Sequence, residues 1–101
     1  MSHSLGQIKF KDGKIMYFEY NGTCDVVCTR LYKTKDDVNK HWRKDNNREC
    51  LCGNESEDVE IATIYGKGYY WYGKACRKCN AITEGVEPLN SYAGLPEWWI
   101  L

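Results

Sequence analysis

The chain has 101 residues, with 14 Lys and Arg against 14 Asp and Glu, and its formal net charge is therefore zero. Proteins that hold nucleic acid by its phosphates usually carry a basic excess, so this balance disfavours that class. The sequence contains no apolar run long enough to cross a membrane, and residues 1–20 lack the apolar core of a signal peptide. We therefore expect one cytoplasmic domain over residues 1–101 with a modest core.

Residues 5–32 are expected to form a three-stranded antiparallel meander. Asp12-Gly13 and Asn21-Gly22 are dipeptides that favour two-residue hairpin turns. If both turns are tight, the alternation of side chains along each strand gives one apolar face. That face would comprise Ile8, Phe10, Ile15, Tyr17, Val26 and Cys28.

Residues 34–45 are expected to form one short helix. Thr34 and Asp37 have the spacing of a capping box, in which the threonine side chain caps the first turn. Val38 and Trp42 lie four positions apart and would share the buried face of this helix.

Two strand-like runs, residues 59–65 and 69–75, predict a β-hairpin in the second half of the chain. In the register we expect, Glu60 faces Lys74, which is an attractive cross-strand pair. A pair of cysteines precedes the hairpin and another pair follows it. The hairpin would therefore bring both pairs together at its open end.

Six cysteines in a reducing compartment favour metal ligation over disulfides. Each of the two pairs beside the hairpin is followed by a residue that tolerates positive φ, Gly53 after the first and Asn80 after the second. Such a bend lets backbone N–H groups point at thiolate sulfurs. We expect one structural zinc ion with no open coordination position. Its ligands would be Cys50, Cys52, Cys76 and Cys79.

The segment over residues 48–83 resembles the zinc-ribbon class, in which two cysteine turns flank a β-hairpin. The resemblance rests on the four cysteines and Gly53, and it departs from the usual pattern because one residue, not two, separates Cys50 from Cys52. Three other uses of the sulfurs stay open. They are an iron site of the rubredoxin type, disulfides formed after export, and a thiol redox role for Cys76 and Cys79.

The aromatic run that begins at Tyr69 places rings on both faces of one strand. Tyr70 and Tyr72 would either pack between sheets or stand exposed as a stacking platform. With Arg77 and Lys78 close by, an exposed platform would suit single-stranded nucleic acid.

The C-terminal tail, residues 84–101, is unusually apolar at its end because of Trp98 and Trp99. It would either close over the core or present an anchor for a partner or for a second copy in a homodimer.

No catalytic arrangement of residues is apparent, so we do not expect an enzyme. The expected fold is mainly β, a small α+β protein with a meander, one short helix and a zinc-ribbon-like hairpin. The expected function is that of a small structural-zinc protein that binds another protein. A nucleic-acid-binding zinc ribbon with a regulatory role is the first alternative, and a thiol redox protein using Cys76 and Cys79 is the second.

Overall fold

A computed structural model of the chain describes residues 3–22, 26–41, 55–64, 68–85 and 91–100. Within these residues the protein is mainly β with one short helix, as the sequence predicts. The elements are β1 (His3–Phe10), β2 (Ile15–Asn21), β3 (Val26–Val27), α1 (Lys35–His41), β4 (Glu57–Thr63), β5 (Tyr69–Cys76), β6 (Ala81–Glu84) and β7 (Tyr92–Ala93).

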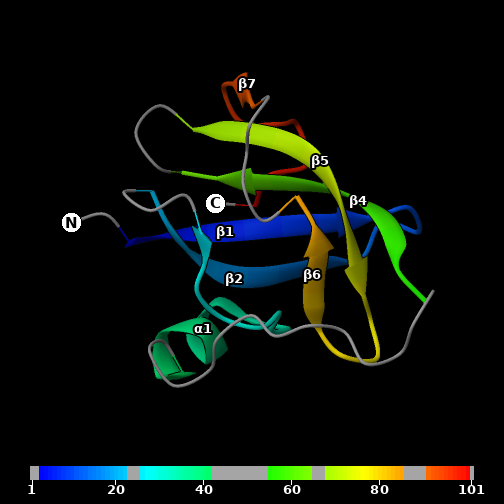
Figure 1. The fold of residues 1–101 in the computed structure, drawn as a ribbon. Helices are drawn as coiled ribbons and strands as arrows, with labels where there is room; N and C mark the ends of the chain where they lie inside the picture. The colour runs from blue at the N-terminus through cyan, green and yellow to red at the C-terminus, as the bar shows by residue number, and fades with distance from the viewer. Residues whose placement is uncertain (1–2, 23–25, 42–54, 65–67, 86–90, 101) are drawn as a thin grey trace.

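The seven strands of the described residues form one antiparallel sheet in the order β3-β2-β1-β4-β5-β6, and β7 also pairs with β5. Figure 1 shows the sheet curling, with α1 beyond β2 at one side and β7 beyond β5 at the other. Strands β1 to β3 are the predicted meander. The predicted hairpin, β4 with β5, is joined to the meander because β1 pairs with β4. One continuous sheet therefore carries both the meander and the strand that ends at Cys76.

The first hairpin turn is longer by one residue than the sequence predicts. The Phe10 N–H donates to the Lys14 carbonyl at 2.9 Å, and the Gly13 N–H donates to the Phe10 carbonyl at 2.9 Å, so three residues form the loop. Gly13 has φ of 93°, which fits a type I turn followed by a glycine bulge. The two-residue turn would also need positive φ at Asp12. Among the described residues, the non-glycine residue with positive φ is Asn80, so Asp12 does not meet this requirement.

This extra loop residue turns the second strand over, so the predicted apolar face is wrong for β2. A slip of one residue sends every side chain to the opposite face, and Ile15 and Tyr17 accordingly lie half-buried on the outer face. Ile8 and Phe10 are fully buried, as predicted. The residues of β2 that fill the core are Met16, Phe18 and Tyr20.

The second predicted turn is also wrong, because β2 continues through Asn21. Asn21 pairs with Val26 and Tyr20 with Val27, so the chain reverses between Asn21 and Val26 and not at Asn21-Gly22. Val27 lies in the core, and Cys28 is half-buried with its N–H bonded to the Glu19 carbonyl at 2.8 Å.

The helix begins as predicted. The Thr34 hydroxyl accepts a hydrogen bond from the Asp37 N–H at 3.1 Å, which is the N-cap contact expected of the Thr-x-x-Asp pattern. Val38 is buried, and Trp42 lies outside the described residues.

The β4–β5 hairpin forms as predicted, but its register differs by two residues. Lys74 faces Asp58, and Glu60 faces Tyr72. Because the shift is even, the predicted division of side chains between the two faces is kept. Trp71 therefore points into the core, where its Nε1 donates to the Gly85 carbonyl at 2.6 Å.

Two glycines permit close approach inside the curled sheet. The Phe18 ring lies over Gly6, where an added Cβ would sit 2.2 Å from a ring carbon. At Gly73 an added Cβ would sit 2.3 Å from the Glu84 carbonyl oxygen. The second contact lets the end of β6 lie close against β5.

Candidate functional site

The outer face of the sheet, which points away from the core, carries ordered rows of side chains across β1, β4 and β5. The strand register aligns Gln7, Ala62 and Tyr70 in one row and Lys9, Glu60 and Tyr72 in the next. Gln7 and Ala62 are fully buried although they lie on this face, whereas Tyr72 is 64% exposed. Another segment of the chain must therefore cover Gln7 and Ala62 of the first row, whereas Tyr72 of the second row stays open to solvent.

The C-terminal tail covers the first row at Gln7. The Gln7 side-chain amide donates to the Ile100 carbonyl at 2.6 Å and accepts from the Ile100 N–H at 3.0 Å. Lys35 of α1 donates to the same carbonyl at 3.1 Å. Trp98 and Trp99, predicted as a binding surface, are half-buried. The tail thus closes over its own sheet, which is one of the two arrangements expected from the sequence.

Tyr70, at the end of this row, forms a group of three tyrosines with Tyr72 and Tyr92, which we call the tyrosine surface. Tyr92 of β7 stacks on Tyr70 with ring centroids 5.2 Å apart and an interplanar angle of 30°. Tyr72 meets Tyr92 edge to face at 6.3 Å and 80°. Tyr72 and Tyr92 are 64% and 53% exposed. Of the two arrangements expected for Tyr72, the exposed one is therefore found.

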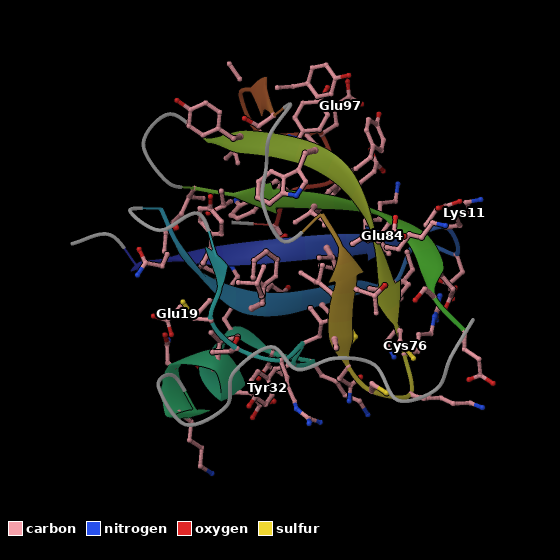
Figure 2. The ribbon with its side chains drawn as sticks, in the orientation of Figure 1. Lys11, Glu19, Tyr32, Cys76, Glu84 and Glu97 are labelled. Atoms are coloured by element: carbon pink, nitrogen blue, oxygen red, sulfur yellow. The ribbon has the colours of Figure 1, made fainter. Side chains whose placement is uncertain are left out.

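A shallow depression of about 260 Å³ adjoins the tyrosine surface. Tyr72 forms one wall, the charged residues Lys9, Lys11, Asp58 and Glu60 form the rim, and the buried residues Phe10 and Val59 complete the lining. Lys11 lies 3.4 Å from Asp58 in an exposed ion pair, and Figure 2 shows Lys11 at the turn after β1. The depression therefore offers one aromatic ring together with hydrogen-bond donors and acceptors.

The second cysteine turn lies at the far end of β5 from Tyr70. Cys76 is the last residue of β5 and is fully buried, and it pairs with Ala81 of β6 across the turn (Figure 2). Cys79 is half-buried. Asn80 has φ of 52°, which confirms the predicted left-handed bend after this pair. Cys50 and Cys52 lie outside the described residues.

Arg77 fastens this cysteine turn to the sheet. Its guanidinium contacts the Asp12 carboxylate at 2.8 Å and makes a two-bond contact with Glu57 at 2.6 and 3.2 Å. It also lies 4.2 Å from the centroid of the buried Phe10 ring. Bidentate arginine–carboxylate pairs are geometrically specific. Arg77 therefore joins the cysteine turn to the β1–β2 turn and to the start of β4.

Lys78 forms a second link from the cysteine turn. Its ammonium lies 2.8 Å from the Glu55 carboxylate. Next to Glu55, the hydroxyls of Ser56 and Thr83 are hydrogen-bonded at 2.8 Å, which ties the chain before β4 to β6. Arg77 and Lys78, predicted as cations for a nucleic acid, are thus both engaged by carboxylates of the same chain.

The hydrogen bond from Arg77, followed by one from the Lys14 N–H, lowers the pKa of Asp12 from 3.8 to about 2. Because the folded pKa lies below the ordinary value, the Asp12 carboxylate stabilises the fold fully above about pH 4. This stabilisation is lost as the pH falls through about 2. We expect Asp12→Asn to reduce the free energy of unfolding at neutral pH and the difference from the native protein to shrink strongly as the pH falls toward 2.

Urea unfolding at about pH 7, pH 4 and pH 2 would measure this dependence. The control is Asp58→Asn, because Asp58 pairs with Lys11 and both side chains are mostly exposed, so its ion pair contributes little. A difference for Asp12→Asn that stays equal at all three pH values would contradict the assignment.

The sequence does not predict Tyr92, Lys9 and Glu60 as neighbours of Tyr72. The sequence predicts Glu60 opposite Lys74, whereas it lies opposite Tyr72. Lys9 reaches this site because β1 pairs with β4, which no local pattern indicates. Tyr92 belongs to a strand of two residues, too short to give a periodic signal. The sequence does indicate that Tyr70 and Tyr72 share one face, because residues two apart along a strand point to the same side.

The sequence matches no known protein family, and the chain matches neither a curated protein nor a solved structure. In the part of the chain that the structure describes, no helix has the length and apolar character needed to cross a bilayer. Within that same part, His, Cys, Asp and Glu side chains form no cluster of three or more suited to a metal ion.

Proposed function

We propose that this protein is a binding module that recognises another protein through its tyrosine surface, on a β scaffold fastened by one structural zinc ion. The observation that carries the proposal is the exposure of Tyr72 and Tyr92 on the outer face of the sheet. Tyrosine is enriched in protein interfaces because it adds a large contact area and a polar hydroxyl with few rotatable bonds. The stacking of Tyr92 on Tyr70 further restricts the rings before any partner arrives.

The charges around the tyrosine surface favour a protein partner over a nucleic acid. The rim beside Tyr72 has two lysines and two carboxylates and is therefore locally neutral. The nearest cationic turn is neutralised by Asp12, Glu55 and Glu57. A nucleic acid would have to displace these carboxylates before it could release counterions. The nucleic-acid alternative is therefore the weaker one.

The zinc part of the proposal draws support from the links around the second cysteine turn. Glu55 is held at Lys78, and Cys52 precedes Glu55 by three residues, a chain length that spans at most about 11 Å. The first cysteine pair is therefore within chain reach of Cys76 and Cys79. The left-handed Asn80 and the buried position of Cys76 fit a closed thiolate site. A site of this kind needs reduced thiols, so we assign the protein to the cytoplasm. Because four thiolate ligands leave no open coordination position, we assign the site a structural role and the protein a binding role without catalysis.

Photo-crosslinking tests the proposed recognition surface. A benzoylphenylalanine at position 72 should form a specific crosslink to a protein in a lysate of the source cells, and excess unlabelled protein should suppress it. Excess Tyr72→Ala protein should fail to suppress it. The control position is Ile64, which is 44% exposed and lies four residues from Glu60 along the chain, about 13 Å. Crosslinking of equal yield and pattern at positions 64 and 72, or none at 72, would reject the surface.

A further inference from the structure

Among the described residues, the strand edge that the tyrosine surface offers to a partner is the short one of β7. One edge of β5 pairs with β4, and the other pairs with β6 and β7. After β6, the main chain at Gly85 lies against Tyr72 and Gly73. A Cβ added to Gly85 would sit 3.1 Å from the Tyr72 carbonyl oxygen. The outermost strand here, β7, has two residues. A partner therefore cannot add a strand of useful length at this place.

The surface also does not suit an amphipathic helix or a phosphorylated segment. A docked helix needs an apolar groove for side chains spread over two turns, about 10 Å. Beside Tyr72 the surface is instead rimmed by charges, including the ion pair of Lys11 with Asp58. Phosphate recognition uses clustered arginines, and Arg77 is already bound by Asp12 and Glu57.

The arrangement of rings does suit a polyproline II segment. Such a segment has no internal hydrogen bonds, repeats every three residues or about 9 Å, and docks on aromatic rings. The rings of Tyr72 and Tyr92 meet at 80° and form a corner against which a prolyl ring can pack. Both rings are more than half exposed, so their hydroxyls can donate to the carbonyls of the segment.

On this basis we infer that the tyrosine surface binds a proline-rich segment in the polyproline II conformation. The inference rests on the proposed function and names the partner's chemistry. Tyr72 and Tyr92 contact the prolines. The depression bounded by Lys9 and Glu60, which face each other across β1 and β4, accepts a polar residue that flanks them. Because the segment and the stacked rings are both stiff before binding, little conformational entropy is lost.

The test is binding of a fluorescein-labelled ten-residue polyproline peptide, followed by anisotropy. We expect saturable binding that is at least about tenfold weaker for Tyr72→Ala and for Tyr92→Ala, since each removes a central aromatic contact. Ile64→Ala is the matched control and should bind like the native protein. Thermal unfolding of each variant verifies that the exposed substitutions leave the fold intact.

A labelled Gly-Ser peptide of equal length serves as the flexible control. Binding of polyproline no tighter than that of the Gly-Ser peptide overturns the inference, and so does equal weakening by Ile64→Ala. If the photo-crosslink at position 72 persists while polyproline fails to bind, the protein-binding function stands and the polyproline inference falls. If the crosslink is also absent, both fall. A crosslinked peptide that contains the proline repeat supports both.

Discussion

One zinc ion per chain is expected in the protein purified under reducing conditions, and Cys79→Ser is expected to abolish its binding. A serine hydroxyl is a far weaker zinc ligand than a thiolate, so one substitution opens the closed site. Structural zinc contributes on the order of 10 kcal/mol of apparent binding free energy in small domains. Removal of the ion is therefore the largest single effect expected for this chain.

The measurement compares intact mass under native and denaturing conditions and records thermal unfolding with and without a chelator. Cys28→Ser is the matched control, because Cys28 is a half-buried cysteine outside the proposed ligand set. The chelator should lower the unfolding temperature of the native protein and of Cys28→Ser to about that of Cys79→Ser. A native protein without metal, or equal loss of metal from both variants, would reject the zinc site. Turnover of a disulfide substrate would then favour the redox alternative.

Phe18→Ala is expected to reduce the free energy of unfolding by about 3–5 kcal/mol, which is the usual loss for a buried aromatic ring. Phe18 is fully buried and its ring fills the space over Gly6, so backbone on one side limits how far the site can collapse. The neighbouring Tyr17→Ala is expected to lower it by only about 1 kcal/mol. Tyr17 is half-buried on the outer face, where Lys35 lies 5.9 Å from its ring centroid.

Urea unfolding of the two variants measures the register of the first hairpin, because adjacent residues point to opposite faces. A two-residue turn at Asp12-Gly13 would bury Tyr17 and expose Phe18, which reverses the order of the two losses. Equal losses for both variants would contradict the face assignment in the structure.

The fold class and several local contacts could be predicted because they depend on short-range chemistry. The Thr34 cap and the left-handed Asn80 follow from the preferences of single residues and their immediate neighbours. The β4–β5 hairpin follows from two strand-like runs and the turn between them. The placement of Tyr70 and Tyr72 on the same face needed only the period of a strand.

The register of the first hairpin could not be read because Asp-Gly fits both a two-residue turn and a three-residue loop with a glycine bulge. Packing decides between the two. The three-residue loop places Phe18 over Gly6 in the core, and it leaves Tyr17 on the face where α1 and the tail lie. The choice thus depends on contacts between residues far apart in the sequence.

By itself, then, the sequence determined a small, mainly β chain with a capped helix, a bend after Cys79 and two tyrosines, Tyr70 and Tyr72, on the same face of one strand. Tertiary structure alone decided that β1 pairs with β4, that Gln7 receives the tail, and that Arg77 is held by two carboxylates. Local preferences act within a few residues, whereas burial, ion pairing and strand alignment depend on groups brought together from distant parts of the chain.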